Sequence, residues 1–149
     1  MSVPTPILGT FRHNIDSKNR IFIPAKHRDA LGTTFVIYPN IRNKYSLIVS
    51  SLEEWEAYVS KIRESDKLSG KDKAAIIKYL TKNGDTLTPD GQGRVVLSSA
   101  LIELVKLEGP TVIVGCDDHA EIMSVESYEL EEAATDFDSL SSKFEDADL

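Results

Sequence analysis

The sequence has few of the residues on which disulfide and metal chemistry depend. Among 149 residues there is one cysteine, Cys116, so no internal disulfide can form, and the three histidines are scattered. This favours a reducing compartment, and no Cys/His spacing typical of a zinc site is present. No apolar run approaches the roughly twenty residues that a membrane-spanning helix needs, and the amino terminus does not resemble a secretory signal. We therefore expect a cytoplasmic protein without a membrane span.

Sequence patterns of catalysis are missing as well. There is no nucleophile-elbow motif, and Gly91-x-Gly93 lacks the Lys-Ser/Thr of a phosphate-binding loop. The carboxylates and histidine of residues 117–121 are potential metal ligands, but a polar turn between two strands is the simpler explanation. Cys116 is most simply a small apolar residue at the end of a strand. We expect no enzyme activity, no cofactor and no metal.

The net charge of −7 argues at first against a nucleic-acid partner, because Lys and Arg supply much of the affinity for phosphate. The charge is unevenly distributed. Residues 1–48 contain seven Lys or Arg and two acids, whereas residues 117–149 contain twelve acids and one Lys. One surface can therefore face DNA while the acidic end points elsewhere, beyond the screening length of about 8 Å at physiological salt.

The chain contains two copies of one unit. Residues 16–23 (DSKNRIFI) align with residues 90–97 (DGQGRVVL), and the downstream segments align at nearly the same offset. Each copy reads as strand, tight loop, short strand, short helix, strand, turn, strand and helix. We divide the chain into a first repeat (7–50), bridging helices (51–83), a second repeat with a C-terminal helix (84–134) and an acidic tail (135–149). On composition, that tail is expected to be frayed, although the spacing of Phe137, Leu140 and Phe144 would also allow a short amphipathic helix.

Local signals place the elements within this plan. Pro24 suits the first position of a helix over 24–31, Ser98 or Ser99 can cap a helix near 99–106, and Ser51 with Glu54 has capping-box spacing. Helical periodicity predicts further helices over 51–63 and 70–82, the first of which carries Trp55 on its core or subunit-interface side. Short segments rich in Val, Ile, Tyr and Thr predict strands at 34–39, 45–50, 111–115 and 120–124.

The Asp-x-x-x-Arg loops are the candidate binding sites. Asp16 and Asp90 can each accept hydrogen bonds from the N–H groups of their own loop, leaving Arg20 and Arg94 to project. Asn19, in place of a glycine, tolerates the left-handed backbone region. For one such loop alone, an ordinary turn with an exposed, weakly stabilising Asp–Arg pair is the favoured explanation. The recurrence of the loop favours a DNA-binding role, with both arginines on one face of the protein. An Arg guanidinium can form two hydrogen bonds with guanine, and Lys18 would add attraction to phosphate.

Together these motifs resemble the MraZ family of bacterial regulators, related to AbrB-type swapped-hairpin DNA binders. The resemblance covers about residues 7–134 and is carried by Gly9, the two Asp-x-x-x-Arg loops, Ile23-Pro24, the 51–55 helix start, Val114-Gly115 and Glu121-Ile122. It implies an α+β fold with a duplicated β-barrel core, pseudo-two-fold symmetry and flanking helices. It also implies a DNA-binding regulator of the division and cell-wall genes, located at the nucleoid. Such a protein assembles into a homo-oligomeric ring on short direct repeats upstream of its own operon.

The resemblance assigns DNA contact to Arg20 and Arg94, loop bracing to Asp16 and Asp90, and phosphate contact to Lys18. Two alternatives remain. An antitoxin-like module would bind DNA and wrap a toxin with its acidic tail, and a neighbouring toxin gene would favour it. A metalloenzyme would use the carboxylates of 117–121, and tight stoichiometric binding of a divalent ion would favour that alternative.

Overall fold

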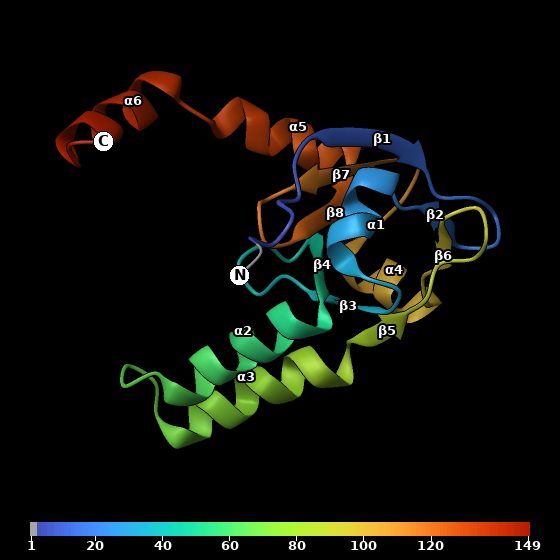
Figure 1. Ribbon diagram of the computed structural model, residues 1–149, viewed down its shortest axis with the longest axis horizontal. Coiled ribbons are helices and arrows are strands. Elements are labelled where there is room, and N and C mark those ends of the chain that lie inside the picture. The colour runs from blue at the N-terminus through green and yellow to red at the C-terminus, as the bar shows by residue number, and fades with distance from the viewer. Residues whose placement is uncertain (1–2) are drawn as a thin grey trace.

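The computed structural model describes residues 3–149 and shows an α+β fold (Figure 1). The strands are β1 (Thr10–Asn14), β2 (Arg20–Phe22), β3 (Phe35–Pro39), β4 (Ser46–Ser51), β5 (Asp85–Leu87), β6 (Arg94–Val96), β7 (Pro110–Gly115) and β8 (Ala120–Ser124). The helices are α1 (Ala25–Leu31), α2 (Leu52–Glu64), α3 (Gly70–Lys82), α4 (Ser99–Val105), α5 (Val125–Ala134) and α6 (Phe137–Asp146). The order of elements from β1 to α2 recurs from β5 to α5, as the repeat predicted.

Every helix except α1 begins where a side chain accepts one of its first free N–H groups. The Ser51 hydroxyl accepts from Glu54 N at 3.1 Å to start α2, and the Ser98 hydroxyl accepts from Leu101 N at 3.2 Å to start α4. Pro24 departs from the prediction, because it is the N-cap of α1 and the helix starts one residue later. Its extended backbone, with ψ of 141°, is that of a cap and not of a first helical residue.

Six strands form one antiparallel sheet in the order β1-β7-β8-β4-β3-β5, while β2 and β6 form a separate two-stranded ribbon. Strands of one copy pair with strands of the other, since β1 pairs with β7, β4 with β8 and β2 with β6. The edge strands β1 and β5 do not pair with each other. The predicted α+β class and duplicated arrangement are confirmed. Within residues 3–149 the sheet stays open and no closed barrel forms, because β2 and β6 pair with each other as a separate ribbon.

Alternating side chains cover both faces of the sheet. Phe35 and Ile37 of β3 point into the main core, which also contains the buried residues of α1, α4 and the ribbon. Val36 and Tyr38 point to the opposite face, where they pack with Leu80 of α3 under the α2–α3 pair. The α2–α3 hairpin extends away from the sheet on this side (Figure 1). Trp55 and Tyr58 of α2 pack against this second cluster, as expected for core residues.

The carboxyl-terminal segment is helical, which corrects the expectation of a frayed tail. The Asp136 side chain accepts hydrogen bonds from the backbone N–H groups of Asp138 and Ser139 and so caps α6. Phe137, Leu140 and Phe144 recur at helical spacing and are 77%, 54% and 57% exposed. The helix projects away from the sheet at the end opposite the ribbon (Figure 1). No helix in the part of the chain described here is long and apolar enough to cross a bilayer.

Candidate nucleic-acid interface

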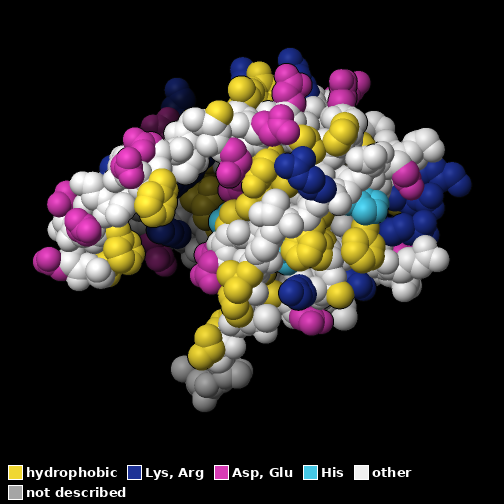
Figure 2. Space-filling view, turned by 90° about the horizontal axis from the view of Figure 1, so that it is seen from above, with side chains coloured by type: hydrophobic (Ala, Val, Ile, Leu, Met, Phe, Trp, Pro, Cys, Tyr) yellow, Lys and Arg dark blue, Asp and Glu magenta, His cyan; other side chains and the backbone are white. Residues whose placement is uncertain are grey.

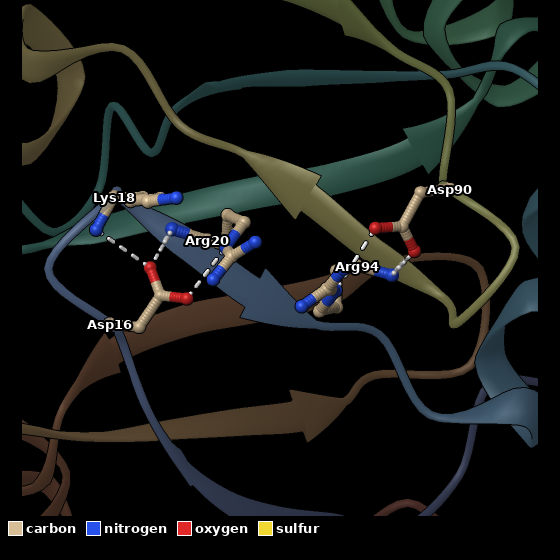
Figure 3. A network of polar contacts seen from close by, with 5 residues as sticks. All are labelled: Asp16, Lys18, Arg20, Asp90 and Arg94. Atoms are coloured by element: carbon tan, nitrogen blue, oxygen red, sulfur yellow. Dashed lines mark hydrogen bonds and ion pairs between the residues drawn. The ribbon is translucent and has the colours of Figure 1, made fainter.

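Each Asp-x-x-x-Arg loop is closed by its own aspartate (Figure 3). Asp16 Oδ1 accepts from the backbone N–H groups of Lys18 and Arg20, both at 2.9 Å, and its Oδ2 accepts from Arg20 Nε at 2.7 Å. Asp90 repeats the pattern, with Oδ1 accepting from the N–H groups of Gln92 and Arg94 and Oδ2 from Arg94 Nε at 2.9 Å. The predicted bracing geometry is therefore present in both copies. The Asp–Arg pair of an ordinary turn is part of the same arrangement.

Hydrogen bonding favours the ionised form of both aspartates. The N–H groups of Arg20 and Lys18, together with the Arg20 side chain, lower the pKa of Asp16 below its usual 3.8 despite an opposing effect of desolvation. The N–H of Arg94 is the largest cause of the corresponding lowering of the pKa of Asp90. The braced conformation of each loop is therefore favoured when its aspartate is ionised and not when it is protonated.

The fourth residue of each loop has a left-handed backbone. Asn19 has φ of 59° and Gly93 has φ of 82°, so asparagine does tolerate the conformation that glycine adopts in the other copy. The two positions differ in their surroundings. A Cβ atom at Gly93 would lie 2.7 Å from Arg28 Cζ, whereas the Asn19 side chain donates a hydrogen bond to Ser99 Oγ at 3.2 Å. The space beside each loop therefore determines which side chain can be accommodated at its fourth position.

The ribbon brings the two loops together in a reciprocal way. Arg20 pairs with Val96 and Arg94 with Phe22. Beyond the strands, Ile23 N donates to Gly93 O at 2.9 Å and Leu97 N donates to Asn19 O at 2.8 Å, so each strand makes the same contact with the opposite loop. These two equivalent hydrogen bonds relate the copies locally by pseudo-two-fold symmetry.

Both arginines lie on the outer face of the ribbon. Directly paired residues in an antiparallel ladder share a face, and residues two apart on a strand share it too. Arg20 and Arg94 therefore lie on one face, while Ile21 and Val95 point inward and are 0% and 3% exposed. The two Arg side chains are 30% and 33% exposed. Within residues 3–149 each guanidinium makes hydrogen bonds only through Nε, so the donors of its terminal amino groups have no partner there.

Charge is separated along the molecule. Lys and Arg side chains gather at one end in Figure 2, on the side where Figure 1 places the β2–β6 ribbon. Acidic side chains gather at the opposite end, along α5 and α6. The uneven distribution seen in the sequence is thus a separation in space, and the ribbon lies at the basic end.

Two supporting residues are visible only in the fold. Arg28 of α1 donates from Nε to Ile23 O at 3.1 Å and lies over the Phe22 ring, so it fills the space beneath the second loop. Ser99 of α4 holds the side chain of Asn19. Arg28 belongs to the first copy and lies beside the loop of the second, whereas Ser99 belongs to the second copy and contacts the loop of the first. Neither residue could therefore be identified from a local sequence motif.

The segment 117–121 does form a turn and the start of a strand, as expected. Its surroundings are more specific than a solvated turn requires. Cys116, His119 and Glu121 offer ligand atoms that all lie within 4.8 Å of one another. His119 Nδ1 is 2.6 Å from Asp118 Oδ1. No zinc-like spacing is visible in the sequence, because a single hairpin turn brings these groups together.

Comparison with known proteins places these features in a family. A family model described as "MraZ protein, putative antitoxin-like" matches residues 7–77. The transcriptional regulator MraZ of Caldanaerobacter subterraneus subsp. tengcongensis is 35% identical over 87% of this chain and 89% of its own length. The corresponding regulators of Natranaerobius thermophilus and Desulforamulus reducens are 31% and 34% identical, over 95% and 82% of this chain and 99% and 84% of theirs. The metalloenzyme alternative is therefore wrong, and the chain belongs to the MraZ family of transcriptional regulators.

Proposed function

We propose that the outer face of the β2–β6 ribbon reads double-stranded DNA, with Arg20 and Arg94 contacting base edges. The observation that carries this proposal is the reciprocal placement of two braced arginines with free amino groups on one exposed face. A two-stranded β-ribbon fits the major groove of B-DNA, and the Arg fork matches guanine O6 and N7. Asp16 and Asp90 brace the loops and do not themselves touch DNA bases.

The register of the β2–β6 ribbon sets the spacing between the two arginines that we propose contact DNA bases. Arg94 lies two residues along the strand from Val96, the partner of Arg20, so the two arginines are diagonal neighbours. Diagonal neighbours are roughly 7–8 Å apart at the backbone. Base pairs are stacked at about 3.4 Å, so the two guanidinium groups can address positions about two base pairs apart within one site.

The two loops differ in charge. Lys18 stands in the first loop where the second has Gln92. We assign phosphate contact to Lys18, so the first copy supplies more of the salt-dependent affinity and the second relies on Arg94. Each subunit then makes a modest contact, and several linked subunits raise overall binding through effective concentration.

The target follows from the family resemblance. We propose that the protein is a nucleoid-associated cytoplasmic homo-oligomer, a closed ring, that binds short direct repeats upstream of its own operon. In this proposal it regulates the division and cell-wall gene cluster. Repeated DNA boxes suit a ring, because adjacent subunits can engage adjacent boxes at the same time.

The test is a binding titration with fluorescently labelled DNA from upstream of the gene, at two salt concentrations. Arg20→Ala and Arg94→Ala should each weaken binding to promoter DNA about 5- to 150-fold, equivalent to the 1–3 kcal/mol of a bidentate base contact. Each substitution should also reduce the difference in affinity between promoter DNA and scrambled DNA. Lys18→Ala should weaken binding to both DNAs alike and reduce the slope of log K against log salt by about 0.9.

Arg63→Ala is the matched control, because Arg63 is an exposed arginine on α2, away from the ribbon. It should bind promoter DNA like the unaltered protein. If the Arg20→Ala/Arg94→Ala double variant stays folded by circular dichroism and still binds the promoter as tightly as the unaltered protein, the proposed interface is wrong.

A further inference from the structure

The hairpin between β7 and β8 directs three potential metal ligands to one side of the sheet. Cys116 N donates to His119 O at 2.8 Å, so the two residues face each other across the turn formed by residues 117 and 118. Glu121 of β8 lies two residues beyond His119, which directly precedes the strand, so the two side chains share a face while Ala120 points to the core. The convergence follows from strand alternation and not from chance contact of loops.

The spacing of the three groups is close to that of a tetrahedral metal site. Their ligand atoms lie within 4.8 Å of one another, and His119 Nε2 is 3.6 Å from Glu121 Oε2. Zinc binds His nitrogen and carboxylate oxygen at about 2.0–2.2 Å and thiolate sulfur at about 2.3 Å. A tetrahedron with these bonds separates nitrogen from oxygen by about 3.4 Å and nitrogen from sulfur by about 3.6 Å. The three ligand atoms must therefore approach one another by up to about 1.2 Å when the metal binds.

Asp118 holds the histidine in the orientation that a metal requires. Its Oδ1 lies 2.6 Å from His119 Nδ1, which leaves Nε2 directed towards Glu121. Metal-bound histidines characteristically donate their second ring N–H to a carboxylate, which fixes the tautomer and raises the basicity of the ligand nitrogen. The Asp118–His119 pair therefore supplies the supporting contact of a metal site in addition to the ligands.

The surroundings favour positive charge. Glu54 and Asp118 line a cavity together with His119 and Glu121. Burial, followed by the charges of Asp118 and other nearby carboxylates, raises the pKa of Glu54. The convergence of the Glu54, Asp118 and Glu121 carboxylates on one cavity therefore favours a cation at this place.

We propose that Cys116, His119 and Glu121 bind a divalent transition metal of the zinc type, with the fourth position open to water or to Glu54. Mixed thiolate, imidazole and carboxylate ligands suit zinc better than magnesium or calcium, which prefer oxygen alone. The bound ion links the end of β7 to the start of β8 and neutralises part of the acidic cavity beside α2. Its role is structural, and it is independent of the proposed DNA contacts at the ribbon.

The experiment is isothermal titration calorimetry of zinc chloride into the full-length, reduced protein, paired with cobalt(II) absorption spectroscopy. We expect one zinc per chain, an increase in Tm at saturation, and a thiolate-to-cobalt charge-transfer band together with the visible bands of tetrahedral cobalt. Cys116→Ser should remove the charge-transfer band, and His119→Gln and Glu121→Gln should each weaken zinc binding at least tenfold. Asp118→Asn, which keeps all three ligands, should weaken it about 10- to 100-fold.

His13→Gln and Glu103→Gln are the matched controls, because both residues are exposed and lie on other elements. They should bind zinc like the unaltered protein. The proposal is overturned if the unaltered protein binds no zinc at micromolar concentration, or if Cys116→Ser and His119→Gln, shown to be folded by circular dichroism, bind it with unchanged affinity.

Discussion

Replacement of Gly93 by alanine tests whether Arg28 fills the space beneath the second loop. The left-handed backbone alone costs about 1–2 kcal/mol for a residue with a Cβ atom. The new methyl group would also lie 2.7 Å from Arg28 Cζ and 3.0 Å from Arg28 Nε. Arg28 must then move and give up its hydrogen bond to Ile23 O, at a cost of about 0.5–1.5 kcal/mol. We expect Gly93→Ala to lower the free energy of unfolding by about 1.5–3.5 kcal/mol.

Gly109 provides the matched control for this substitution. It also has a positive φ, of 67°, but a Cβ atom there would meet nothing within 4 Å. Gly109→Ala should therefore show the backbone cost alone. Urea denaturation of both variants at equal protein concentration measures the difference, and the Tm of Gly93→Ala should fall by roughly 3–14 °C for a chain of this size.

A double-mutant cycle isolates the contact with Arg28. If the clash is real, Gly93→Ala should cost about 0.5–1.5 kcal/mol less in an Arg28→Ala background than in the unaltered protein. Equal losses of stability for Gly93→Ala and Gly109→Ala would refute the argument, because the backbone term would then account for the whole effect.

Two further predictions concern the second core cluster and the loop carboxylates. Leu80 is fully buried between α3 and the sheet, so Leu80→Ala should lower the free energy of unfolding by about 2–5 kcal/mol in urea denaturation, and a loss below 1 kcal/mol would contradict the packing. Because the pKa values of Asp16 and Asp90 are lowered on folding, their stabilising effect is complete above about pH 3.8 and is lost as the pH falls through the folded values. Carboxyl carbon NMR titration should place both midpoints below 3.8, and midpoints at or above that value would show that the bracing hydrogen bonds are absent in solution.

Much of the fold could be predicted from local signals. Ser51 and Glu54 mark the start of α2 because their contact spans only three residues, and the order of elements followed from the internal repeat. The bracing of Asp16 and Asp90 was predictable for the same reason, since each aspartate contacts only its own loop. The open sheet was not predictable, because the pairing of β2 with β6 depends on contacts between distant parts of the chain.

In the candidate sites, too, the features that the sequence did not predict depend on the folded structure. The support of Gly93 by Arg28 was missed because the two residues belong to different copies. The convergence of Cys116, His119 and Glu121 was missed because no ligand-spacing motif describes a single tight hairpin. Helix α6 was only the less favoured alternative, because the acidic composition favours disorder, although Asp136 caps the helix and Phe137, Leu140 and Phe144 recur at helical spacing.

The pairing of strands across the two copies has a consequence for how the chain folds. Neither β1 nor β2 has a partner within its own half, because both pair with strands that come much later in the sequence. The first half should therefore remain incomplete during synthesis until the second half emerges, and long-range pairing of this kind is slow. If the chain is cut in the loop between α3 and β5, the two fragments should fold poorly alone and should restore the native structure when they are mixed.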